Sequence, residues 1–305
     1  MELKKEALRL LSAVIIAVVL LILMVFFPRT QEVMVFGPAG TLDFGYRLDV
    51  HQYKADIVQY FQMVWQEKTL GGTMFQTVSV EDEIARYYPK SLLIICISFL
   101  LSIGFGVWKG IFDYRNMNTK KNLLGNGTTW AFQSIPDFFV VFVFFCISFY
   151  FLPHERIFSN SNWYSFLAPA LLVSIYPIMY VARITCVSLL NQDGQDYIRT
   201  AFSKGFKAKQ VIYKHILKNS LIDMVGNLPT IMIVIVSNLL MVEYLTGFEG
   251  AANRLFVAMG GRQISGFTAP IEAELVLGLA FCFMLTVLAV HILKLALLAK
   301  LVKKG

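Results

Sequence analysis

The sequence predicts an all-α polytopic membrane protein with about six transmembrane helices. Its residues are 57% hydrophobic and only 15% charged, and the mean hydropathy is +0.62. A soluble domain carries about a quarter charged residues, so this chain needs lipid to cover its surface. The 26 Phe and 13 Tyr residues suit lipid-facing helices with rings at the membrane interface.

Six apolar stretches reach the roughly 20 residues that a helix needs to cross a bilayer. They are residues 10–27, 91–112, 130–152, 164–187, 224–246 and 271–293. The first stretch resembles a signal peptide, but Pro28 and Arg29 follow it instead of a cleavage site, so we interpret it as a retained span. Pro169 and Pro177 predict a kink in the fourth stretch.

The segments between these stretches suggest a division of the chain. Residues 1–27 would form a cytoplasmic amino terminus with the first span, 28–90 a small cap, 91–298 the transmembrane core and 299–305 a tail. Within 28–90, apolar residues recur at helical spacing over 52–65, so we expect a folded cap with an amphipathic helix.

The distribution of charge predicts the orientation. With the amino terminus inside, most of the 27 Lys and Arg residues lie in the inner segments 1–9, 113–129 and 188–222, at the inner helix ends, or in the tail. The positive-inside rule then places both termini in the cytoplasm and the cap outside. This placement accounts for the net charge of +7 without nucleic acid.

Several kinds of chemistry find no support in the sequence. No GxxxxGK[ST] phosphate loop is present, so the chain cannot bind ATP by that route. We find no paired carboxylates, no Ser-His-Asp set and no His-rich metal cluster at membrane depth, which argues against an enzyme or a cofactor in this chain. The glycines Gly104, Gly106 and Gly110 lie inside a span and predict close helix packing.

The most informative segment is the long inner loop, residues 191–222. It reads as a short helix over 196–204, then Gly205, then a second amphipathic helix. Glycine at this position permits the positive φ that a tight turn between helices requires. A basic loop lying on anionic lipid is the simple alternative, and physical reasoning alone gives the two interpretations equal weight.

This loop resembles a motif of the permeases of binding-protein-dependent ABC importers, in particular the first-type subunit of the oligopeptide, dipeptide and nickel class. The matching residues are Asp196, Tyr197, Ile198, Arg199, Thr200, Ala201, Lys204, Gly205, His215 and Asn219. Similarity to the family extends over about residues 55–280 and includes Pro136, Ala182-Arg183, Val242-Glu243 and Gly250.

The resemblance implies a type I permease fold in a bacterial cytoplasmic membrane. The loop would dock into a cleft on an ATPase subunit, with Ala201 as a small residue on the docking face. It further implies four partners: a second permease subunit, two ATPase subunits that bind ATP and Mg, and an extracytoplasmic solute-binding protein. Transport would proceed by alternating access.

Three departures from the family pattern leave the solute open. Ile222 stands where the family usually has proline, Phe248-Glu249-Gly250 replaces a Trp-Pro-Gly-like turn, and the chain stops at Lys303-Lys304-Gly305. Oligopeptides, dipeptides, a nickel chelate and an opine-like metallophore all remain as candidates.

A secondary transporter or channel for a small polar solute is the alternative function. Such proteins place ionisable groups and broken helices at the middle of the membrane. The candidates here are Asp137 beside Pro136, which either lines a solute route or serves a structural purpose, and Glu243. For Glu243 we favour a partnered carboxylate at a helix end.

Overall fold

The computed structural model describes residues 2–26, 31–36, 42–47, 50–73, 78–151, 164–193, 195–261, 263–264, 267–268 and 271–303. The chain forms two compact units, which are described separately. The first comprises Met1–Arg86 with Leu255–Cys282, and the second comprises Tyr87–Arg254 with Phe283–Gly305.

Five helices are long and apolar enough to cross a membrane, and a bent helix pair raises the number to six if it counts as one span. The five are α1 (Glu2–Val25), α3 (Val80–Arg115), α7 (Leu167–Gln192), α11 (Leu228–Thr246) and α13 (Ala273–Lys303). The prediction of about six spans in an all-α membrane fold is therefore confirmed.

Helix α3 begins about three turns before the predicted span. The Ser79 hydroxyl accepts a hydrogen bond from the Asp82 N–H at 3.2 Å, and Glu81, Asp82 and Glu83 occupy the first turn. Acidic residues and a serine cap both stabilise a helix amino terminus, which explains why the helix starts at Val80 although its apolar stretch starts later.

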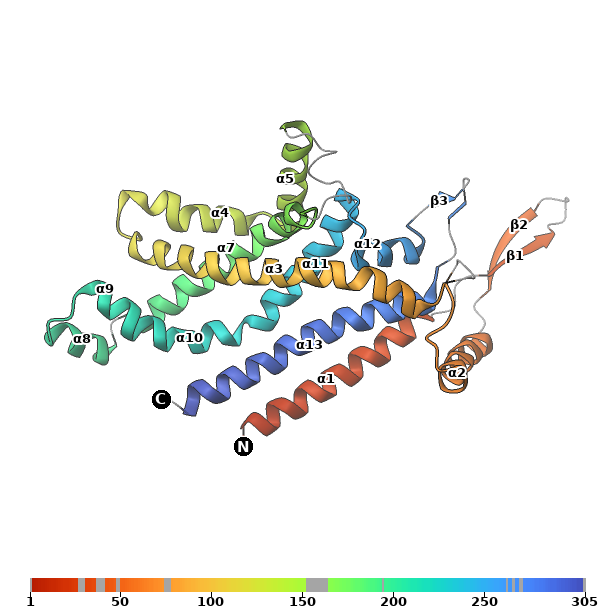
Figure 1. The fold of residues 1–305 in the computed structure, drawn as a ribbon, viewed down its shortest axis with the longest axis horizontal. Coiled ribbons are helices and arrows are strands. Elements are labelled where there is room, and N and C mark those ends of the chain that lie inside the picture. Colours follow the sequence, from red (N-terminus) through yellow and green to blue (C-terminus); the bar gives the residue numbers. More distant parts are fainter. Residues whose placement is uncertain are drawn as a thin grey trace. The chain divides into compact units, whose positions relative to one another are not determined.

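The third apolar stretch is two helices, and the prediction of a single helix over 130–152 is wrong. Residues 120–134, which end in α4 (Thr128–Ser134), meet α5 (Asp137–Phe151) at 104°, and Figure 1 shows the bend. Ile135 is extended, with φ −102° and ψ 137°, because the following Pro136 disfavours helical backbone. By contrast, α7 remains one helix with Pro177 inside it.

The first unit contains two short antiparallel strand pairs that the sequence analysis did not predict. Strand β1 (Gln31–Phe36) pairs with β2 (Leu42–Arg47), and β3 (Gln263–Ile264) pairs with β4 (Phe267–Thr268). The amphipathic helix expected over 52–65 is present as α2 (Val50–Glu67). Tyr53 of α2 donates a hydrogen bond to the Leu23 carbonyl at 3.0 Å, so α2 folds back against the end of α1.

In the second unit, α7 is the central helix and packs against α4, α5, α10 and α11. Its contact with α3 depends on two glycines. A Cβ atom added at Gly106 would lie 2.5 Å from the Val181 Cβ, and one at Gly110 would lie 2.5 Å from the Ala182 carbonyl oxygen, whereas Gly104 faces open space. Close helix packing is thus confirmed at two of the three predicted glycines.

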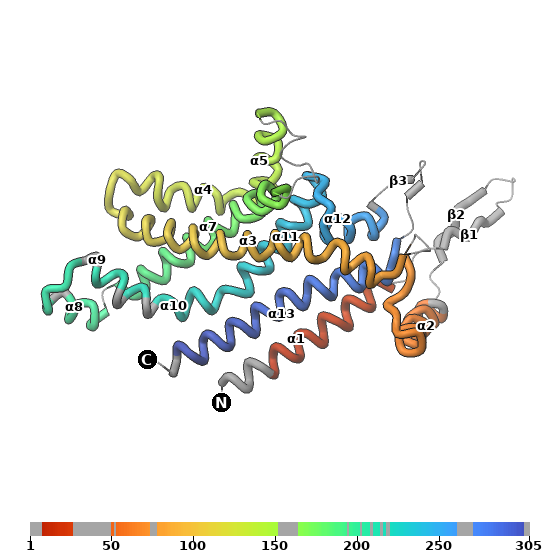
Figure 2. Tube along the Cα trace, in the orientation of Figure 1, coloured from red at the N-terminus to blue at the C-terminus, as the bar shows by residue number. Residues whose placement is uncertain are grey.

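The loop after α7 forms the predicted sequence of helix, glycine and helix. Helix α8 (Asp196–Ser203) is followed by Gly205, by α9 (Ala208–Val211), by a π-helical turn, η3 (Ile212–Ile216), and by α10 (Leu217–Gly226). The path from α8 through α9 into α10 can be followed in Figure 2.

Candidate functional site

Helix α8 is fixed to the rest of the chain by one apolar face. Ile198 and Ala201, one turn apart, are both buried. They belong to a cluster with Ile111 of α3, Leu189 of α7, Val211 and Ile216, which we call the loop core. The loop is therefore packed on the ends of two spanning helices and is not a loose connection.

The opposite face of α8 is polar and exposed. Asp196, Arg199, Thr200, Ser203 and Lys204 all have exposed side chains. The Thr200 hydroxyl donates to the Asp196 carbonyl at 2.9 Å, and the half-buried Tyr197 donates to Gln192 Oε1 at 2.9 Å. The helix thus presents a charged surface while its apolar face holds its position.

Gly205 ends α8 in the left-handed region, with φ +78°, as predicted. The Phe206 N–H donates to the Ala201 carbonyl at 3.3 Å, which is the long-range bond of a Schellman motif. Phe206 also packs against the loop core. The positive φ therefore lets the chain reverse direction and return to the cluster that anchors α8.

The expectation that Ala201 lies on a docking face is not met. Its side chain is only 5% exposed and points into the loop core. A small residue is needed there because α8 packs closely on its own chain. The backbones of His215 and Asn219 lie in η3 and α10, whereas their side chains are outside the described residues.

Asp137 and Pro136 lie together at the sharp bend. Pro136 is exposed and Asp137 is half-buried. Asp137 Oδ1 accepts a hydrogen bond from the Phe138 N–H at 2.9 Å. A carboxylate at this point stabilises the first turn of α5, because the free N–H groups of a helix amino terminus favour negative charge.

Glu243 is fully buried near the end of α11. Its Oε1 accepts from the Ser91 hydroxyl at 2.5 Å, and its Oε2 accepts from the N–H groups of Ala252 at 2.9 Å and Asn253 at 3.1 Å. The last two belong to α12 (Ala251–Phe256). Glu243 is thus a partnered carboxylate near a helix end.

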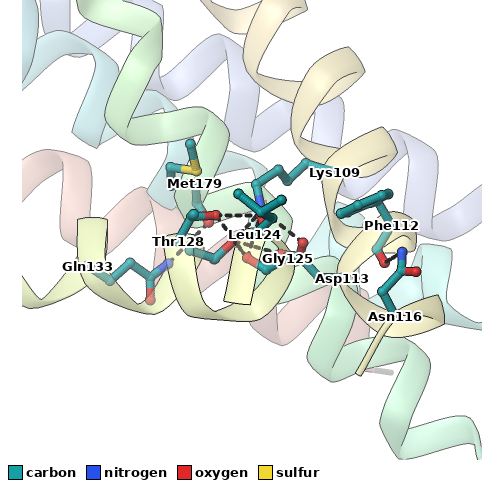
Figure 3. A network of polar contacts seen from close by, with 10 residues as sticks. Lys109, Phe112, Asp113, Asn116, Leu124, Gly125, Thr128, Gln133 and Met179 are labelled. Carbon is teal, nitrogen blue, oxygen red and sulfur yellow. Dashed lines mark hydrogen bonds and ion pairs between the residues drawn. The ribbon is translucent and has the colours of Figure 1, made fainter. Parts of the chain in front are cut away.

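Sequence reasoning missed a buried ion pair on α3. Lys109 Nζ donates to Asp113 Oδ1 at 2.8 Å, to the Gly125 carbonyl at 3.0 Å and to Thr129 Oγ1 at 2.9 Å. Thr129 in turn donates to Asp113 Oδ2 at 2.6 Å. Figure 3 shows Lys109 and Asp113 of α3 beside Gly125 in the turn before α4. The spacing of four residues between Lys109 and Asp113 was the available signal.

A second polar contact joins α4 to α7 beside this network. Gln133 Nε2 donates to the Met179 carbonyl at 3.1 Å, as Figure 3 shows, and Gln133 Oε1 accepts from Arg183 Nη1 at 2.5 Å. The segment before the bend is thus held at two places. Lys109 of α3 binds it at Gly125 and Thr129, and Arg183 of α7 binds it at Gln133.

Comparison with known proteins gives a consistent family. A family model described as binding-protein-dependent transport system inner membrane component matches residues 68–303. A Brucella suis permease protein, provisionally named for a peptide transport system, is 24% identical over 312 residues and 95% of both chains. The oligopeptide transport system permease protein OppB of Escherichia coli is 27% identical over 187 residues and 60% of each chain.

The fold comparison agrees with this result. An inward-facing structure of the MetNI methionine ABC transporter is similar with a TM-score of 0.58, at 16% sequence identity, over 72% of this chain and 95% of that chain. The family model covers α3, the bend, the α8 loop and α13. This chain therefore belongs to the family of binding-protein-dependent transport system inner membrane components and is a multi-pass permease subunit of an ABC importer, not an enzyme.

Proposed function

We propose that this chain and a second, similar permease subunit form the route of a peptide-like solute across the inner membrane, driven by two ATPase subunits. The observation that carries the proposal is the geometry of α8, whose apolar face is buried in the loop core while its charged face is exposed. Relatives named for peptide and oligopeptide transport support the class of solute.

In this proposal α8 docks into a cleft on an ATPase subunit. Arg199, Thr200 and Lys204 are exposed and available to a partner. The loop core contains Ile111 of α3 and Leu189 of α7, so a force applied to α8 would move two spanning helices directly. ATP and Mg would bind to the ATPase subunits, and nucleotide-driven closure would switch the permease between its two access states.

A second permease subunit follows from the number of spans. The five or six candidate spans of this chain are few for a pathway that admits a peptide, and paired subunits place such a pathway at their interface. The large apolar side chains of Leu100, Phe105 and Trp108 on α3 are exposed and would meet lipid or that subunit. Asp137, beside the bend at Pro136, is our candidate for a polar group on the solute route.

The outer partner would be a solute-binding protein that docks on the cap, residues 28–90, with both termini of the permease in the cytoplasm. In the first unit, α2 exposes Asp56, Gln59, Gln62 and Gln66 along a polar groove that also includes Glu274. A polar outer face of this kind suits a transient contact with a soluble partner better than an apolar one would.

Reconstitution tests the proposal against a secondary transporter or channel. The chain is purified from its native membrane together with the proteins that it binds, and these partners are identified by mass spectrometry. Uptake of labelled oligopeptides into liposomes should require ATP and stop when the ATPase subunits carry an inactivated phosphate loop. Uptake by the purified chain alone, driven by an ion gradient, would instead favour a secondary transporter.

A further inference from the structure

The Glu243 clamp joins α3 to α11 and α12, two consecutive helices that lie far from α3 in the sequence. It consists of Ser91 of α3, Glu243 of α11 and the backbone N–H groups of Ala251, Ala252 and Asn253. The Ser91 hydroxyl donates to Glu243 Oε1 at 2.5 Å and accepts from the Ala251 N–H at 2.7 Å. Glu243 Oε2 accepts from the other two N–H groups, at 2.9 and 3.1 Å.

The turn between α11 and α12 is shaped to fit over this carboxylate. Gly247 ends α11 with φ +65°, and the Asn253 side chain donates to the Phe248 carbonyl at 3.0 Å. Gly250 passes so close to Glu243 that an added Cβ atom would overlap its carboxylate. Glycine is therefore needed at this point for space.

Opening the clamp would leave several buried groups without partners. Ser91, Glu243, Ala251 and Ala252 are all fully buried. Moving α3 away from α11 and α12 would leave Glu243 Oε1 and the Ala251 N–H without the Ser91 hydroxyl, and moving α12 away from α11 would take the Ala252 and Asn253 N–H groups from Glu243 Oε2. Either separation strands buried polar groups, which is far more costly than breaking an exposed contact. The neighbouring pair of Lys90 and Glu249, 3.6 Å apart and about half exposed, is of the weak exposed kind.

We propose that Glu243 is a positioning residue that makes the adjoining parts of α3, α11 and α12 one rigid body, which stays closed in both access states of the transporter. The clamp would hold the turn that follows α11 in one position. This fixed position would allow binding of the solute to stimulate ATP hydrolysis by the ATPase subunits. This inference rests on the proposed function, because it assigns the clamp a part in the transport cycle.

The first test restrains the clamp region with a cross-link. Lys90→Cys and Glu249→Cys are introduced together into a chain without its native cysteines, assembled with its partners and joined by a short bifunctional thiol reagent. A rigid body predicts peptide uptake within about twofold of the transporter before cross-linking. A loss of about tenfold or more after cross-linking, with each single cysteine variant unaffected by the reagent, would show that these segments separate during transport.

The second test removes the clamp and reads out coupling. Glu243→Gln keeps the shape of the side chain but removes its charge. Its amide oxygen can still accept from the Ala252 and Asn253 N–H groups and its amide nitrogen can donate to Ser91 Oγ, so the charge-assisted bonds of the clamp are replaced by weaker neutral ones. We expect assembly and basal ATP hydrolysis to be kept and stimulation by peptide to fall about fivefold or more. A purely structural role would instead lower basal and stimulated hydrolysis together, in proportion to the folded protein. Ser91→Thr should retain stimulation that Ser91→Ala loses.

A third measurement needs only the purified chain and is therefore independent of the proposed function. In the chain that carries both introduced cysteines, Gly250→Ala should slow their cross-linking by about tenfold, because the new methyl group displaces the turn from the carboxylate. In a Glu243→Ala background the same substitution should add nothing, since the space is then free. Equal effects of Gly250→Ala in both backgrounds would refute the clamp. If peptide stimulates ATP hydrolysis neither in the parent transporter nor in any variant, the result would instead count against the proposed function.

Discussion

Lys109 Nζ and Asp113 Oδ1 lie 2.8 Å apart, one turn apart on α3, with the Asp113 side chain fully buried and the Lys109 side chain 15% exposed. The Gly125 carbonyl and Thr129 satisfy the remaining protons of the ammonium group. Because every charged atom in this network has a partner, the loss of either charge leaves the other one buried and uncompensated.

Asp113→Ala should therefore destabilise the protein by about 3–5 kcal/mol, as expected for an unpaired buried charge. The double variant Lys109→Met, Asp113→Leu should lose less than the single variant, because both charges leave together. The melting temperatures of the parent, Asp113→Ala and the double variant are compared in detergent. Lys120→Met is the control, because Lys120 is exposed. Melting of Asp113→Ala at the parent temperature would contradict the ion pair.

Gly205→Val should uncouple ATP hydrolysis from uptake. Its φ of +78° is disfavoured for a β-branched residue, and the strain should cost about 1–3 kcal/mol. Gly205→Asn is the matched control, because asparagine tolerates the left-handed region and nothing lies within 4 Å of the added Cβ atom. Peptide-stimulated ATP hydrolysis per assembled complex is the measurement. Similar coupling in both variants would show that the conformation of this turn has no part in coupling ATP hydrolysis to uptake.

The two faces of α8 should respond differently to a new carboxylate. Ala201→Glu places a charge in the loop core and should reduce the amount of folded protein. Arg199→Glu changes only the exposed face, so we expect normal folding and weaker co-purification of the ATPase subunits. If the loop only lies on anionic lipid, Arg199→Glu keeps its ATPase subunits, and joint neutralisation of Lys207, Lys209 and Lys214 is the harmful change.

The orientation can be tested by labelling single cysteines in a chain that lacks its native ones. Asn118→Cys, in a predicted inner segment, should be protected from an impermeant thiol reagent in intact cells. Lys68→Cys, in the predicted outer segment, should react at once. Both residues are exposed, so burial does not confuse the result. The opposite pattern of labelling would reverse the assignment of both termini.

Local signals in the sequence identified the features that depend on neighbouring residues. The apolar spacing over 52–65 predicted α2, and Gly205 predicted a positive φ at the end of α8. The 104° bend was not predicted: Pro177 sits inside a continuous α7, while Ile135-Pro136 breaks the third stretch. Proline removes one N–H group in either setting, and only packing decides whether the helix continues.

Hydropathy and turn chemistry act over a few residues at a time, so the amino-acid sequence was enough to identify the membrane class, a count of about six spans and the family motif. The residues that cover Ala201 and the partners of the buried charges depend on long-range contacts in the fold. Ser91 and Glu243 are 152 residues apart, and Lys109 meets Thr129 from another segment. A buried charge needs a partner, but its spacing in the sequence does not say which polar group the fold will bring to it.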